Sequence, residues 1–134
     1  MIVIDTSAVL EVLAGSDPDP RLAQRMASAG SLHAPHLIDV EVLSGLRGLV
    51  RGGKLTADRA SDARLDFANL ALVRYPISGI ADRVWALRDA ATCYDACYLA
   101  LAEALDSPLV TTDGRLSRSR GHSAAVELYP ATSN

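Results

Sequence analysis

The chain has 134 residues, of which 49% are hydrophobic and 4% aromatic, and its net charge at pH 7 is −3. This length suits one domain with its own core, so we expect residues 1–134 to form a single domain whose tail frays after about residue 130. No apolar run approaches the roughly 20 residues that span a bilayer, and the first ends too early for a secretory signal, which favours a cytoplasmic protein.

The first predicted element is a short buried strand that ends in an acid. Ile2, Val3 and Ile4 have the β-branched composition of such a strand, and Asp5 follows directly, with Thr6 next. In an open parallel sheet, ligands bind outside the carboxyl ends of the strands. The sequence therefore predicts that Asp5 lies at the mouth of a site.

Short strands and helices alternate along the rest of the chain. This alternation predicts an α/β fold, a three-layer α/β/α sandwich around a short, mostly parallel sheet. Pro35 suits the first turn of a helix that is apolar nearly all round, which predicts that this helix is buried or covered by a partner. Helices are expected at about residues 6–14, 21–29, 35–50, 56–70, 80–87 and 92–105, and strands at about 31–34, 71–75, 108–112 and 124–129.

Three further acids are predicted near the end of the sheet that carries Asp5. Asp113 follows the strand at 108–112, Glu41 lies about a turn and a half into the Pro35 helix, and Asp95 lies in the first turn of a helix that begins at Thr92. Each acid also has a structural explanation. Asp5 and Asp95 fit helix caps and Asp113-Gly114 fits a turn, while Asp39 is a rival for the role of Glu41.

Taken together, the acids favour a metal site. Converging carboxylates repel one another and lose solvation, and the sequence places no lysine or histidine near them. A divalent cation resolves this conflict, and an all-oxygen ligand set suits Mg²⁺ or Mn²⁺ better than zinc. Magnesium is commonly bound by a few carboxylates together with substrate phosphates, which indicates phosphodiester chemistry.

These segments resemble the PIN-domain ribonucleases, and within them the VapC toxins of type II toxin–antitoxin pairs. The matching pieces are Ile2-Val3-Ile4-Asp5-Thr6-Ser7, Glu41-Val42, Tyr94-Asp95-Ala96 with Tyr98-Leu99-Ala100, and Leu109-Val110-Thr111-Thr112-Asp113. The resemblance implies a PIN-like fold. It implies that the hydroxyls of Thr6 and Thr111 orient an acid cluster that binds the metal, made of Asp5, Glu41, Asp95 and Asp113.

The resemblance also implies an activity and partners. We expect an endoribonuclease in which Mg²⁺ or Mn²⁺ activates a water that hydrolyses RNA to 5′-phosphate and 3′-hydroxyl products. Glu41 or Asp113 would position or deprotonate that water, and Arg115, Arg118 and Arg120 could hold flanking phosphates. The family further implies a homodimer and a VapB-type antitoxin that covers the acidic cleft.

Other readings of the sequence are weaker. The segment from Gly48 to Lys54 nearly matches a phosphate-binding loop, but Leu55 replaces the required Ser or Thr. His33-x-x-His36 lacks a third zinc ligand, and Cys93 and Cys97 read as reduced core thiols. The serious alternative is a catalytically inert PIN-fold module that dimerises and binds a partner. The presence of all four acids argues against it.

Overall fold

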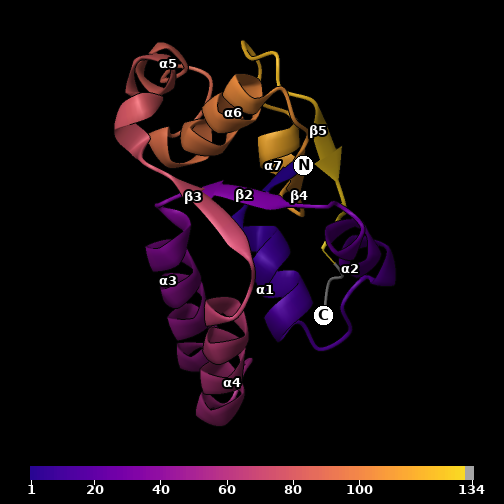
Figure 1. The fold of residues 1–134 in the computed structure, drawn as a ribbon. Helices are drawn as coiled ribbons and strands as arrows, with labels where there is room; N and C mark the ends of the chain where they lie inside the picture. The colour runs from indigo at the N-terminus through magenta and orange to yellow at the C-terminus, as the bar shows by residue number, and fades with distance from the viewer. Residues whose placement is uncertain (132–134) are drawn as a thin grey trace.

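The structure, a computed structural model, describes residues 1–131 and contains a five-stranded sheet (Figure 1). The strand order is β3-β2-β1-β4-β5, and every neighbouring pair is parallel. The predicted α/β class is confirmed, and the sheet is fully parallel because the last strand enters after a short helix instead of a hairpin. The strands are β1 (Ile2–Ile4), β2 (Leu32–Pro35), β3 (Leu72–Tyr75), β4 (Leu109–Thr111) and β5 (Val126–Leu128).

Helices cover both faces of this sheet, which confirms the three-layer sandwich (Figure 1). The first four helices lie below the sheet in this view, and the last three lie above it. The lower helices are α1 (Thr6–Ala14), α2 (Pro20–Ala27), α3 (Ile38–Arg51) and α4 (Ala57–Ala68). The upper ones are α5 (Ala81–Ala86), which follows the 3₁₀ turn η1 (Ile77–Gly79), and α6 (Cys93–Leu105) and α7 (Gly114–Ser117).

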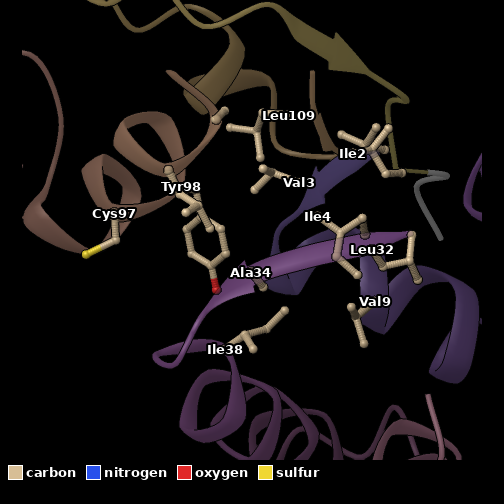
Figure 2. Packing of buried hydrophobic residues seen from close by; sticks show 14 of the residues in the cluster. Ile2, Val3, Ile4, Val9, Leu32, Ala34, Ile38, Cys97, Tyr98 and Leu109 are labelled. Atoms are coloured by element: carbon tan, nitrogen blue, oxygen red, sulfur yellow. The ribbon is translucent and has the colours of Figure 1, made fainter. Parts of the chain in front are cut away.

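The core surrounds β1, the middle strand. Ile2, Val3 and Ile4 have no exposed surface, because helices cover both faces of the strand. Figure 2 shows Val3 near Leu109 and the Tyr98 ring of α6, and Ile4 near Val9 of α1. This burial fixes the point at which the chain leaves β1, and so fixes the residue that follows it.

The predicted helical start at Pro35 is wrong. Pro35 is the last residue of β2, where it pairs with Tyr75 of β3, and the amide of His36 donates to the Tyr75 carbonyl at 2.8 Å. The pairing of β2 with β1 involves only Leu32 and His33, so the missing N–H of Pro35 costs no hydrogen bond on that side. Because α3 begins at Ile38, Glu41 lies in its first turn instead of a turn and a half along it.

The apolar α3 helix is only partly buried. Val40 is 57% exposed and Leu43 50%, while Ile38, Val42 and Leu46 face the core. α3 approaches α1 closely at Gly45, where a Cβ atom would collide with Leu10 of α1. The exposed side of α3 is therefore available for contact with a partner.

Two other sequence motifs have structural explanations. His33 is buried on β2, and its two ring nitrogens lie 2.7 Å from the Tyr75 hydroxyl and 2.8 Å from the Ser31 hydroxyl, so it is satisfied without zinc. Both cysteines are free thiols, but only Cys97 is buried, so the core assignment is wrong for Cys93, the first residue of α6.

No helix among the described residues is long and apolar enough to cross a membrane. The frayed tail predicted after about residue 130 falls mainly on residues 132–134, which lie outside the described part of the chain.

Candidate active site

Asp5 and Asp113 follow adjacent parallel strands at the same edge of the sheet. Ile4 of β1 pairs with Val110 of β4, so the two strands end side by side. Each acid is the N-cap of the next helix: the Asp5 carboxylate accepts from the Ala8 amide of α1, and the Asp113 carboxylate accepts from amides of α7. The two acids thus cap helices as well as meeting at one edge, and the partial positive charge of each helix N-terminus favours a carboxylate there.

Asp5 is buried and held by hydroxyls. Its Oδ1 accepts from the Ser7 hydroxyl at 2.7 Å and the Ala8 amide at 3.0 Å, and its Oδ2 accepts from the Thr111 hydroxyl at 2.5 Å. Burial raises the pKa of Asp5, and the negative charge of Asp113 raises it further, while the three hydrogen bonds act in the opposite direction. Burial is the largest of these effects, so an ionised Asp5 needs a nearby positive charge.

Glu41 lies in a second group of hydroxyls, at the start of α3. Its Oε1 accepts from the Thr6 hydroxyl at 3.0 Å and from the Tyr98 hydroxyl at 2.6 Å. Burial and the bond to Glu41 raise the pKa of Tyr98 far above its usual range, so its hydroxyl remains a donor. Asp39, the rival acid, instead forms an ion pair with Arg74 at 2.9 Å.

Asp95 and Asp113 share one arginine. Arg115 Nη2 lies 3.4 Å from Asp95 Oδ2 and 3.6 Å from Asp113 Oδ2, and the Arg115 side chain is 71% exposed. Burial raises the pKa of Asp95; Arg115 lowers it, and the negative charges of Asp113 and Glu41 raise it again. Asp95 therefore interacts electrostatically with two of the other acids.

The three arginines after Asp113 differ in their surroundings. Arg115 contacts the acids, which the sequence did not predict, because α7 turns its first residues back towards α6. Arg118 and Arg120 are exposed and form no ion pair within residues 1–131. Phosphate binding by Arg118 and Arg120 stays a prediction.

Sequence reasoning missed two hydroxyl residues of this site. Ser7 donates to Asp5 and accepts from the Thr112 amide at 3.0 Å, so it ties the ends of β1 and β4 together. Tyr98 reaches Glu41 from the next helix turn after Asp95. The spacing of Tyr98 three residues after Asp95 places both on one face of α6, a signal that was available in the sequence.

The donor set fits a hard divalent cation in its chemistry. The four acids come from four parts of the fold, and carboxylate and hydroxyl oxygens form the set. Within residues 1–131, however, no three His, Cys, Asp or Glu side chains are already close enough together to hold one ion. Side-chain adjustment would therefore be needed for these acids to hold one ion together.

Comparison with known proteins identifies the family. The PIN domain family matches residues 2–121, and a VapC ribonuclease of Mycobacterium bovis is 40% identical over 130 residues, 97% of this chain and 99% of that protein. The chain belongs to the PIN-domain family, among the VapC proteins. Ribonuclease VapC12 of Mycobacterium tuberculosis is 36% identical over 128 residues, covering 96% of this chain and 98% of that one.

Solved VapC structures share the PIN fold. The VapBC2 complex of Rickettsia felis bound to a promoter DNA fragment contains a chain with a TM-score of 0.68 and 13% identity, covering 96% of this chain and 99% of that one. The PIN-domain match at residues 2–121 contains all four candidate acids and the three arginines after Asp113. In this VapC protein, then, the candidate site lies wholly within the family domain.

Proposed function

We propose that this VapC protein is a Mg²⁺- or Mn²⁺-dependent endoribonuclease and the toxin of a toxin–antitoxin pair. One observation carries the proposal: four acids from separate parts of the chain gather near the carboxyl end of a parallel sheet, where burial and the charges of the neighbouring acids raise the pKa of Asp5 and of Asp95. The curated relatives named ribonucleases support RNA as the substrate.

Asp5, Glu41, Asp95 and Asp113 would hold the cation, which when bound makes a water molecule more acidic and neutralises charge on the scissile phosphate. Glu41 or Asp113 orients or deprotonates the attacking water. Thr6 orients Glu41 through its hydroxyl, and Thr111 orients Asp5. Arg118 and Arg120, exposed just beyond Asp113, bind flanking RNA phosphates.

The direct test measures cleavage of structured RNAs by the purified wild-type protein. We expect cleavage with Mg²⁺ or Mn²⁺, none with excess chelator, and recovery when the cation is restored. Products should carry 5′-phosphates. Metal-dependent RNA binding without cleavage would instead support the inert partner-binding module.

Arg115 should compete with the cation for Asp95 and Asp113. Replacing Arg115 with alanine removes a positive charge from both acids, so Mn²⁺ affinity measured by calorimetry should rise by about two- to tenfold, the range expected for exposed ion pairs. If Arg115 also contacts RNA, the same variant should raise KM. Arg21→Ala, which breaks the remote pair with Asp19, controls for the change in net charge. Equal Mn²⁺ affinity in the Arg115→Ala and wild-type proteins would contradict the competition.

Partner binding is the second part of the proposed function. The partner is a VapB-type antitoxin that covers the acidic cleft; the similarity in fold to VapBC2 of Rickettsia felis supports an antitoxin partner. A groove of about 560 Å³ begins beside Ser7 and runs between α1, α3 and α4 towards Lys54 and Arg59, which offers room for a partner segment next to the acids. We further propose that the chain acts as one domain in the cytoplasm and forms a homodimer, using exposed apolar side chains such as Val40, Leu43 and Tyr94.

A further inference from the structure

Tyr98, Thr6 and Glu41 form a closed triangle between α6, α1 and α3. The Tyr98 hydroxyl lies 2.6 Å from Glu41 Oε1, the Thr6 hydroxyl lies 3.0 Å from the same atom, and the two hydroxyls are 3.1 Å apart. Figure 2 shows the Tyr98 ring extending from α6 past the sheet, with its oxygen on the α3 side near Ala34 and Ile38. The three helices thus meet at one carboxylate oxygen.

The hydroxyl of Tyr98 has no packing role. The residue is 2% exposed, and phenylalanine would fill the same space without a polar group that loses water on burial. A buried phenol is tolerated when its hydroxyl has a partner, and here the partner is Glu41. The bond lies in the range of short hydrogen bonds to ionised acceptors.

The two hydroxyl protons of this group determine which of its contacts are hydrogen bonds. Two hydroxyls carry two protons, but the triangle has three sides. When Glu41 is ionised, both protons point at Oε1, and the Thr6–Tyr98 side is a contact without its own proton. Oε1 then accepts two hydrogen bonds, and the side-chain hydrogen bonds of Glu41 within residues 1–131 leave Oε2 uncommitted.

We propose that Tyr98 is a positioning residue that, with Thr6, fixes Oε1 of Glu41 and so aims Oε2 at the reacting groups. This inference rests on the proposed nuclease function. Tyr98 does not touch substrate; it acts through Glu41, whose side chain would otherwise rotate about three bonds. Because Oε1 accepts from donors on two other helices, the relative positions of the three helices determine the direction in which Oε2 points.

The test is a double-mutant cycle with Tyr98→Phe and Glu41→Gln. Tyr98→Phe should lower kcat by about 10- to 100-fold, as loss of an outer orienting contact does, and leave the KM for RNA within about twofold. Mn²⁺ affinity, measured by calorimetry without RNA, should fall in Tyr98→Phe if it falls in Glu41→Gln. In the Glu41→Gln background, Tyr98→Phe should change neither quantity further.

Two more variants keep the outcome decisive. Tyr75→Phe removes a comparable hydroxyl from its 2.7 Å contact with His33 and should keep wild-type kcat and Mn²⁺ affinity, even if its Tm is a few degrees lower. Thr6→Val removes the other donor to Oε1 and should lower the same quantity as Tyr98→Phe. Losses that multiply in the double mutant, or a Tyr98→Phe protein equal to wild type in kcat and Mn²⁺ affinity, would overturn the assignment. A wild-type protein that cleaves no RNA refutes the proposed function instead, and the Mn²⁺ cycle still tests the triangle.

Discussion

Replacing Asp95 with asparagine should reduce RNA cleavage by at least about 100-fold, because loss of a metal ligand should cost no less than the 10- to 100-fold lost with an outer-shell partner. Asparagine keeps the size of the side chain and removes its charge. The fold should be little affected, because the helix cap at this point uses the Asp95 backbone amide, which donates to Thr92. Asparagine can also keep the side-chain hydrogen bond with Thr92 and loses only the charge that faces exposed Arg115. Cleavage rates at saturating Mg²⁺ and thermal unfolding of both proteins measure the two effects.

Asp39→Asn is the matched control for this variant. It also removes one carboxylate and one ion pair, at the start of α3, but the partner is Arg74 and not the Arg115 that Asp95 and Asp113 share. Cleavage should stay within about twofold of wild type, and stability should fall by at most about 1 kcal/mol, the usual worth of an exposed pair. Expression of wild type or Asp39→Asn alone should slow growth, and Asp95→Asn should not. Equal cleavage by Asp95→Asn and wild type would rule out Asp95 as a ligand.

The sequence predicted the fold well because its strongest signals are local and agree with one another. A strand such as Ile2–Ile4 is apolar throughout, as a strand covered on both faces must be, and Thr56 and Thr92 cap α4 and α6 as their positions suggest. The errors lie where pairing between distant segments decides. Pro35 suits a helix start on local grounds, but the register of β2 with Tyr75 of β3 draws it into the sheet.

The candidate acids could be predicted because strand ends in a parallel sheet share one edge. What could not be predicted is how each side chain is held. The sequence predicted a turn where the short helix α7 forms, so the ion pair between Arg115 and Asp95 was not predicted. The contact of Tyr98 with Glu41 joins residues 57 positions apart, and it depends on how α6 and α3 are placed on the two faces of the sheet, which the spacing of Tyr98 from Asp95 does not specify.

Asp5→Asn should make the protein more stable in the absence of divalent cations and at the same time reduce its cleavage of RNA. Burial raises the pKa of Asp5 from its ordinary 3.8, so the ionised carboxylate is a cost to the folded state at neutral pH. Asparagine can keep the hydrogen bonds from Ser7 and Ala8 on its Oδ1, and its Nδ2 can donate to the Thr111 hydroxyl in place of the bond that Asp5 accepts, without a buried charge. In the absence of divalent cations at pH 7, we expect the variant to be the more stable protein, with a Tm that rises by about 3–6 °C for each added kcal/mol in a domain of this size. Its cleavage of RNA should fall at least about 100-fold, as for Asp95→Asn.

The pH dependence follows from the sign of the shift. Below the folded-state pKa, the folded wild-type protein takes up a proton at Asp5 and loses the cost of the charge, so the advantage of Asp5→Asn is largest above that pKa and disappears as the pH falls towards 3.8. Urea unfolding in chelator at pH 7 and pH 4 measures this change. Asp113→Asn is the control: the Asp113 side chain is 32% exposed, so the variant should lose cleavage without a comparable gain in stability.

Adding the cation should reverse the order of stability. At a Mg²⁺ concentration 100 times its Kd, binding to the native state stabilises the wild type by about 2.7 kcal/mol, and Asp5→Asn, lacking a ligand, should gain much less. The wild type would then be the more stable protein in Mg²⁺ and the less stable one in chelator. Two results would contradict this role of Asp5 as a metal ligand whose buried charge destabilises the metal-free protein. One is an equal rise in the Tm of both proteins in Mg²⁺, and the other is a lower stability of Asp5→Asn than of the wild type in chelator at pH 7.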